Sequence, residues 1–270
     1  MTALAAARGW RASTITAVGE VLSPTRITAA AAQVGVQLFL VVCLWRALYA
    51  HTHVSAGLTE PQAVSYAILA ALAMRIRGTG RWQARDMVIQ HVQLGTIVYW
   101  YLRPLSPQRY YFWREAGDQV YGLAWAAAGY LVCLALGVMK PPASVAGAGA
   151  FALTFALGMS ILYYLVLLTD QMCFWMIKNG AVVAIVAFAQ NLLSGGYAAL
   201  WFYPHWFQVG SAVLPFEYTM GIPLSFYVGR LGISDLPREV AAAVLWMIIL
   251  ALFTRFLWRR AGERVVSQGG

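Results

Sequence analysis

The sequence is short of charge and of cysteine. Only 11% of its 270 residues are charged and 61% are hydrophobic, whereas an ordinary soluble domain carries about 25% charged residues. The shortage of charge excludes a typical soluble protein, and the 14% aromatic content excludes a disordered chain. Cys43, Cys133 and Cys173 form no CxxC pair, which disfavours a disulfide scaffold or a zinc module. The chain is instead predicted to cross a membrane several times.

Long apolar runs are abundant, and a helix needs roughly 20 residues to cross a hydrocarbon core. Runs of suitable length predict six transmembrane helices, at about residues 27–50, 61–80, 115–138, 144–168, 181–203 and 238–258. No internal repeat and no linker divides the chain, so residues 1–270 are predicted to form one domain. The predicted fold is an all-α membrane protein, to which residues 1–23 add an interfacial helix.

The basic residues indicate how these helices are oriented. The chain has 19 Lys and Arg and a net charge of +9, which a membrane explains better than nucleic acid does. With the N-terminus in the cytoplasm, fifteen of the 19 fall inside. The four at or near the outer side are Arg46, Lys140, Arg230 and Arg238. Both termini are therefore predicted to be cytoplasmic, because cytoplasmic loops carry the excess of Lys and Arg.

The segment between the second and third spans is predicted to contain an amphipathic cytoplasmic helix. Polar and apolar residues form opposite stripes there at helical spacing. The polar stripe is Gln83, Asp86, Gln90 and Gln93, and the apolar stripe is Val88, Ile89 and Val92. Such a helix either docks into a groove of a cytoplasmic partner or lies on lipid. Arg103, in an aromatic run broken by prolines, can pair with lipid phosphate, with Asp86 or with an acidic residue of a partner.

The outer segment 204–237 is too apolar for a solvated loop and contains three prolines before its end, at residues 204, 215 and 223. Two short helices, broken at the prolines and dipping back toward the bilayer, would bury its aromatic and aliphatic residues. A charged residue is unusual in such a place. Glu217, between Phe216 and Tyr218, either caps a short helix or meets a polar substrate group at an outer gate, and capping is the favoured interpretation.

The predicted spans carry almost no ionisable group at mid-depth. Their polar residues are Gln33, Gln37, Gln190 and Asn191, which line a substrate pathway or form hydrogen bonds between helices. A transporter coupled to protons or sodium normally needs ionisable or cation-coordinating groups there. The chain also has no GxxxxGK[ST] phosphate loop and no HExxH or GxSxG motif. These absences favour a transport subunit that is driven by a separate ATPase.

Several motifs in a fixed order resemble the permease subunits of bacterial type-2 ABC exporters. The motifs are Leu102-Arg103-Pro104-Leu105-Ser106, Ser194-Gly195-Gly196, Phe202-Tyr203-Pro204-His205-Trp206, Leu214-Pro215-Phe216-Glu217-Tyr218 and Tyr227-Val228-Gly229-Arg230-Leu231. The resemblance covers nearly the whole chain. It departs at residues 91–95, where His-Val-Gln-Leu-Gly stands in place of an acidic-Ile-Arg-x-Gly pattern.

The resemblance implies an exporter in the bacterial cytoplasmic membrane, with the chain as half of its pore. Two ATPase subunits would bind ATP and Mg²⁺, a second permease, identical or related, would complete the pore, and this chain would bind no cofactor and no nucleic acid. The helix from Arg85 to Gln93 would dock into the ATPases. The residues expected at that coupling site are Arg85, Asp86, Ile89, Gln90, Gln93 and Arg103. The expected cargo is hydrophobic or amphipathic.

Two other functions remain open from the sequence. The chain could be a membrane enzyme acting on a lipid-linked substrate, with Glu115, Asp118, His91 and Glu217 as its acid–base groups. Glu115 and Asp118 also suit a simple dipole role near a helix N-terminus. Alternatively, the chain could be a membrane scaffold or immunity component that transports nothing. His51, His53 and His205 have no carboxylate or cysteine at ligand spacing, so no metal site is predicted.

Overall fold

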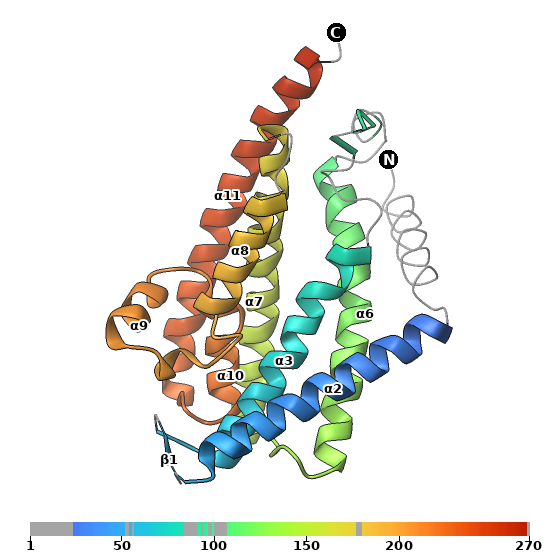
Figure 1. Ribbon diagram of the computed structural model, residues 1–270. Coiled ribbons are helices and arrows are strands. Elements are labelled where there is room, and N and C mark those ends of the chain that lie inside the picture. Colours follow the sequence, from blue (N-terminus) through green and yellow to red (C-terminus); the bar gives the residue numbers. More distant parts are fainter. Residues whose placement is uncertain are drawn as a thin grey trace.

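The protein is a helical bundle in which long helices run between two ends of the molecule (Figure 1). The computed structural model describes residues 24–51, 54–55, 57–83, 91–92, 94–96, 99, 107–176 and 180–268. The β1 hairpin and the connection from α6 to α7 lie at one end, and the C-terminus lies at the other (Figure 1). The predicted interfacial helix at residues 1–23 and the predicted helix around residues 85–93 fall largely outside the described residues.

The helices differ widely in length. The α-helices are α2 (Pro24–Tyr49), α3 (Glu60–Gln83), α6 (Pro107–Ala135), α7 (Val145–Gln171), α8 (Gly180–Leu193), α9 (His205–Ala212), α10 (Gly221–Tyr227) and α11 (Leu236–Gln268). The 3-10 helices are η1 (Met172–Phe174), η2 (Leu200–Phe202), η3 (Glu217–Thr219) and η4 (Ile233–Asp235). Two-residue strands, β1 (Val54–Ser55) and β2 (Leu58–Thr59), form an antiparallel pair.

The composition of the helices confirms a helical membrane protein. Among the described residues, three helices are long and apolar enough to cross a bilayer: Ile27–Tyr49, Val145–Phe174 and Ile233–Ala261. Two shorter apolar helical stretches, Gly122–Ala135 and Ala181–Leu193, lie within the third and fifth predicted spans. Helix α3 occupies the second predicted span. The number of six crossings stays a prediction.

The fifth predicted span, 181–203, is wrong at its C-terminal end, because α8 ends at Leu193. Gly195 has φ +77°, a left-handed conformation that glycine adopts without a Cβ penalty. The Gly195 N–H donates to Leu192 O, and the Gly196 N–H donates to Asn191 O. This pair of bonds is the Schellman motif, which satisfies the last carbonyls and ends the helix. The chain then turns and forms η2 before Pro204.

Helix α6 begins at Pro107, eight residues before the predicted start of the third span at 115. Proline suits the first position of a helix because its fixed φ is helical and its missing N–H would have no partner there. The helix therefore extends beyond its apolar part at the end near the chain's C-terminus (Figure 1). Hydropathy alone places the start of the span too late, because it stops where the charged residues begin.

Helix α3 is the centre of the main hydrophobic core. Every residue from Ala63 to Ala73 is buried, and α3 packs against α2, α6 and α10. Alanine recurs along this stretch, at residues 63, 67, 70, 71 and 73. Small side chains allow helix backbones to approach closely, and close packing stabilises helices within a membrane. The small side chains of α3, rather than its hydropathy, therefore allow it to lie at the centre of the core.

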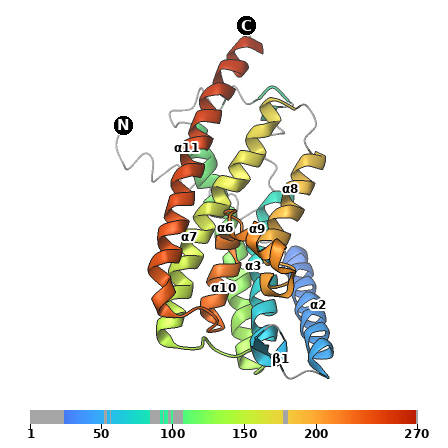
Figure 2. The ribbon, with the colours of Figure 1, turned by 90° about the vertical axis from the view of Figure 1, so that its left-hand side faces the viewer.

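Helices α7 and α11 form a second packed layer, and α10 and η3 lie against α7 (Figure 2). The two short helices of the segment 204–237 differ in burial. All residues of α10 except Ile222 are buried, whereas on α9 Trp206 is 74% exposed and Val209 is 53% exposed. Pro204 precedes α9 and Pro223 lies inside α10, and only α10 buries its apolar residues within this chain. That these helices dip back toward the bilayer stays a prediction.

Candidate functional site

The turn after α8 lies where three parts of the bundle meet. Tyr66 of α3 is 1% exposed and donates a hydrogen bond from its hydroxyl to the carbonyl of Gly195 over 3.1 Å. On the other side, the Ser194 hydroxyl is 3.7 Å from Met220 Sδ, and Met220 immediately precedes α10. The turn thus connects α3, α8 and α10 through buried contacts.

Glycine is needed at this turn for space as well as for conformation. A Cβ on Gly195 would lie 2.7 Å from the Tyr66 hydroxyl oxygen. A Cβ on Gly196 would lie 3.1 Å from both Asn191 O and Met220 Sδ. The Ser194-Gly195-Gly196 motif therefore sets how closely α8 approaches α3 and α10.

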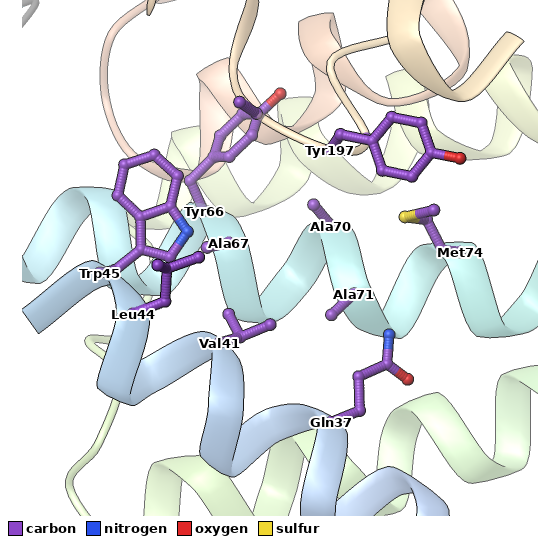
Figure 3. Close-up of a pocket in the computed structure, with 12 residues that line it drawn as sticks. Gln37, Val41, Leu44, Trp45, Tyr66, Ala67, Ala70, Ala71, Met74 and Tyr197 are labelled. Atoms are coloured by element: carbon purple, nitrogen blue, oxygen red, sulfur yellow. The ribbon is translucent and has the colours of Figure 1, made fainter. Parts of the chain in front are cut away.

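A cavity of about 210 Å³ opens beside this turn, between α2 and α3. Its lining is mostly apolar and includes Trp45, Tyr66 and Met74, together with residues 196–198. Gln37 of α2 is its one carboxamide, and Figure 3 shows that amide directed toward α3. A cavity of this kind offers an apolar surface and one polar group that both donates and accepts hydrogen bonds.

A second cavity, of about 460 Å³, lies between α7, α8 and α11. Gln190 and Phe216 line it, and Gln190 is only 5% exposed. The four polar residues predicted to line one pathway are therefore not gathered in one place. Gln37 and Gln190 line different cavities, Gln33 is exposed on α2, and Asn191 is half-buried with its backbone carbonyl in the turn after α8.

The predicted outer-gate residues, Phe216, Glu217 and Tyr218, are half-buried and lie at η3, against the middle of α7. A Cβ on Gly158 of α7 would lie 2.4 Å from the Tyr218 carbonyl oxygen. The absence of a side chain at Gly158 thus allows the backbone of η3 to touch α7. Helical spacing alone does not distinguish Gly158 from the other glycines of α7.

Glu217 is a carboxyl group held away from water, in the connection between α8 and α11 and outside the predicted spans. Burial raises the pKa of Glu217 from 4.5 to about 7, with a smaller contribution from the nearby charge of Glu239. Its Cγ would be 2.9 Å from a Cβ on Gly221, the first residue of α10. Neither η3 nor α10 has a side-chain capping hydrogen bond from its N-cap residue, Phe216 or Met220, and Glu217 lies in the first turn of η3. The capping interpretation therefore stays a prediction.

The predicted ATPase-coupling residues lie outside the described part of the chain. These residues are Arg85, Asp86, Ile89, Gln90, Gln93 and Arg103. Immediately beside them, Val92 packs against a cluster that contains Leu167, Phe174 and Trp258. The end of the coupling segment therefore packs against a cluster to which α7, η1 and α11 contribute residues.

The structure does not bring together His91 and Glu217, the two residues of the alternative acid–base set whose side chains it describes. His91 Nδ1 is 2.8 Å from the Thr96 hydroxyl, and its neighbour Val92 packs at the level of Leu167. Glu217 lies near Gly158, nine residues or about 14 Å away along α7. The side chains of Glu115 and Asp118 are outside the described residues. Within the described residues there is also no cluster of His, Cys, Asp and Glu that could hold a metal ion.

Several residues of this site were missed from the sequence. Tyr66 and Trp45 form much of the wall around the first cavity, and Trp201 packs edge-on against Tyr66 with ring centroids 5.0 Å apart. Aromatic residues are common in membrane helices, so nothing in their spacing distinguishes these three. Gly195 carries the one usable indication, since a glycine pair after an apolar run often marks a helix end.

Most of the chain matches a known protein family. A family model described as "ABC-2 family transporter protein" matches residues 36–269. No curated protein and no solved structure matches the chain. The match includes every helix discussed here except the beginning of α2.

Proposed function

The chain belongs to the ABC-2 family of transporter proteins, and on that premise we propose that it is an export permease driven by separate ATPase subunits. It is a membrane permease, as its family and its apolar helices indicate. The proposal adds the direction of transport, the coupling to ATP, and a second permease, identical or related, that completes the pore. The family match over residues 36–269 is the observation that carries it.

Energy must come from a partner, because the sequence contains no GxxxxGK[ST] phosphate loop. The predicted amphipathic helix from Arg85 to Gln93 is the proposed contact with two ATPase subunits, which bind ATP and Mg²⁺. Support comes from Val92 within this helix, which packs against a cluster that includes Leu167 of α7 and Trp258 of α11. Through this cluster, a push on the coupling helix would reach α7, against which η3 and α10 pack.

The proposed cargo is hydrophobic or amphipathic, because the cavity between α2 and α3 is mainly apolar and has Gln37 as its carboxamide. This cavity borders the turn that Tyr66 holds. Movement of that turn would change the cavity and the position of α10 together. Phe216, Glu217 and Tyr218 are proposed to follow as the outer gate, since η3 leads directly into α10.

Affinity purification of the tagged chain in mild detergent tests the proposal. The chain should copurify with a nucleotide-binding subunit, and the complex should hydrolyse ATP while the chain alone does not. Inverted membrane vesicles that contain the complex should accumulate cargo only with hydrolysable ATP. Hydrolysis of ATP by the isolated chain, or the absence of a nucleotide-binding subunit, would contradict the proposal.

A charge on the coupling helix tests where the ATPase docks. Gln90→Asp places a carboxylate on the polar stripe, away from the apolar stripe on which Val92 packs against the bundle, and should reduce recovery of the nucleotide-binding subunit by about tenfold, since desolvating an unpaired charge costs more than about 1.4 kcal/mol. Ile233→Asp is the matched control. Ile233 is 45% exposed in η4, which directly precedes α11 and so lies away from the chain's C-terminus, and this variant should copurify with the ATPase as the wild type does.

A further inference from the structure

A third cavity forms a groove of about 410 Å³ between α3, α6, α7 and α10. Small side chains create the hollow, namely Ala73, Ala126, Ala127, Ala148 and Ala152. Ala127 of α6 and Ala152 of α7 are themselves exposed, so the groove opens on the outer surface of the bundle. Apart from the hydroxyl groups of Tyr130 and Tyr227, the side chains that line it are apolar.

The size and chemistry of the groove restrict what can fill it. One turn of a helix with its side chains, about 10 Å across and 5.4 Å long, occupies roughly 420 Å³. A whole partner helix therefore does not fit within the groove and could only lie across its opening. An apolar hollow of this kind does not retain water. A hydrocarbon chain is narrow enough to enter it and matches its lining.

One end of the groove is polar. The Tyr227 hydroxyl donates to the carbonyl oxygen of Lys140 over 3.0 Å and lies 3.1 Å from the Tyr130 hydroxyl. The Lys140 N–H donates to the Ser65 hydroxyl over 3.0 Å. These bonds tie the backbone of Lys140 to Tyr227, whose side chain lines the groove, while the side chain of Lys140 is exposed.

We propose that this groove binds one acyl chain of a membrane glycerophospholipid, whose phosphate is bound by Lys140. The apolar channel accepts the acyl chain, and the exposed ammonium supplies the charge that complements a phosphate. The lipid would then touch four helices at once. Because lipid tails are as apolar as the lining, selectivity arises from the fit of the chain and from the headgroup.

The test measures lipid binding to the purified wild-type chain by native mass spectrometry in detergent. The probes are palmitoyl-oleoyl phosphatidic acid and palmitoyl-oleoylglycerol, which have the same acyl chains and differ only in the phosphate. Wild-type protein should bind the phospholipid about fivefold more tightly. Lys140→Gln should remove that preference, and Lys140→Arg should keep it.

Two neighbouring alanines provide a matched test of the groove. Ala127→Trp places an indole inside it and should weaken phospholipid binding by about tenfold or more. Ala128→Trp adds the same group at the next exposed position of α6, outside the groove, and should bind as the wild type does. Ala152→Trp fills the groove from α7 and repeats the test if the first variant does not fold.

Equal phospholipid affinities for the groove-filled and the Ala128→Trp proteins would overturn the proposal. So would equal affinities of the wild type for the two lipids. Neither result depends on ATP, cargo or a partner protein. The proposal can therefore fail while the export function stands, and the export function can fail while the lipid site stands.

Discussion

At Gly158, midway along α7, the backbone of η3 occupies the space that any side chain would need. Gly158→Ala would place a Cβ 2.4 Å from the Tyr218 carbonyl oxygen and 3.1 Å from Thr219 Cα. Both obstacles are backbone atoms, so relief requires η3 to move away from α7. We expect the free energy of unfolding to fall by about 1–3 kcal/mol, measured as a lower midpoint of thermal unfolding in detergent.

Gly149→Ala is the control for this prediction. Gly149 lies in the same helix, and a Cβ added there would have no heavy atom within 4 Å. The substitution should therefore stabilise α7 by about 0.5–1 kcal/mol through helix propensity alone. If both variants unfold at the same temperature, the close contact between α7 and η3 has no energetic significance.

The half-buried carboxyl of Glu217 predicts a dependence of stability on pH. Because its pKa is raised from 4.5 to about 7, the folded protein binds this proton more tightly than the unfolded chain does between these values. The stabilisation is complete below about pH 4.5 and is lost as the pH rises through 7. The contribution lost is at most about 3 kcal/mol. Thermal unfolding between about pH 5 and pH 8 measures it.

Glu217→Gln imitates the protonated side chain and should flatten this part of the pH profile. Glu239 of α11 also faces Glu217 and contributes to its raised pKa, so Glu239→Gln should reduce the slope without abolishing it. A Glu217→Gln protein with the wild-type slope would mean that another group is responsible.

Among the elements, the turn that ends α8 has the most consequences for the site. Gly195 and Gly137 both end helices in the same pattern of backbone hydrogen bonds, with φ +77° and +65°. Replacing either by Ala should cost about 1–2 kcal/mol through the left-handed backbone. Gly195→Ala should cost more, because its Cβ would also lie 2.7 Å from the Tyr66 hydroxyl.

Thermal unfolding of the two variants separates these effects. At Gly137 no heavy atom lies within 4 Å of the added Cβ, so Gly137→Ala reports the backbone cost alone. The difference between the two variants reports the contact of the turn with α3. Equal losses at the two positions would show that Tyr66 moves aside freely and does not hold the turn.

The elements also differ in how well the sequence predicts them. Helices α7 and α11 match the predicted spans 144–168 and 238–258 closely at their N-terminal ends, because a long apolar run has few alternatives. The predicted end of α8 is wrong by ten residues, since residues 197–203 are apolar enough to continue the run. There the left-handed conformation of Gly195 ends the helix, and hydropathy does not detect such a conformation.

For the whole molecule, the asymmetry of basic residues predicts which end faces the cytoplasm. In a protein whose Cys43, Cys133 and Cys173 are replaced, Lys140→Cys should react with a membrane-impermeant maleimide in intact cells. Arg259→Cys should react only after the membrane is permeabilised. Both positions are exposed, and the connection from α6 to α7, which contains residue 140, and the C-terminal part of α11, which contains residue 259, lie toward opposite ends of the bundle (Figure 1). The reverse pattern of labelling would invert the predicted topology.

The sequence also identifies candidate residues, but it does not show which of them lie close together in the folded protein. Gln37 and Gln190 are correctly singled out as polar residues of apolar helices, yet they line separate cavities on different sides of the bundle. Glu217 stands out as an unusual charge, but its approach to Gly221 depends on how η3 folds back onto α10. Spacing along one helix predicts a shared face, and it carries no information about which helices become neighbours.

The sequence by itself determined that this chain is a helical membrane protein that lacks a phosphate loop, because hydropathy and motif content depend on residues taken in order. It also determined the family, through the match of residues 36–269 to a family model. Only the tertiary structure decided that α3, interrupted by arginine and modest in hydropathy, lies at the centre of the core. Packing between helices depends on side-chain shape, and the alanines of α3 allow its neighbours to approach from several sides.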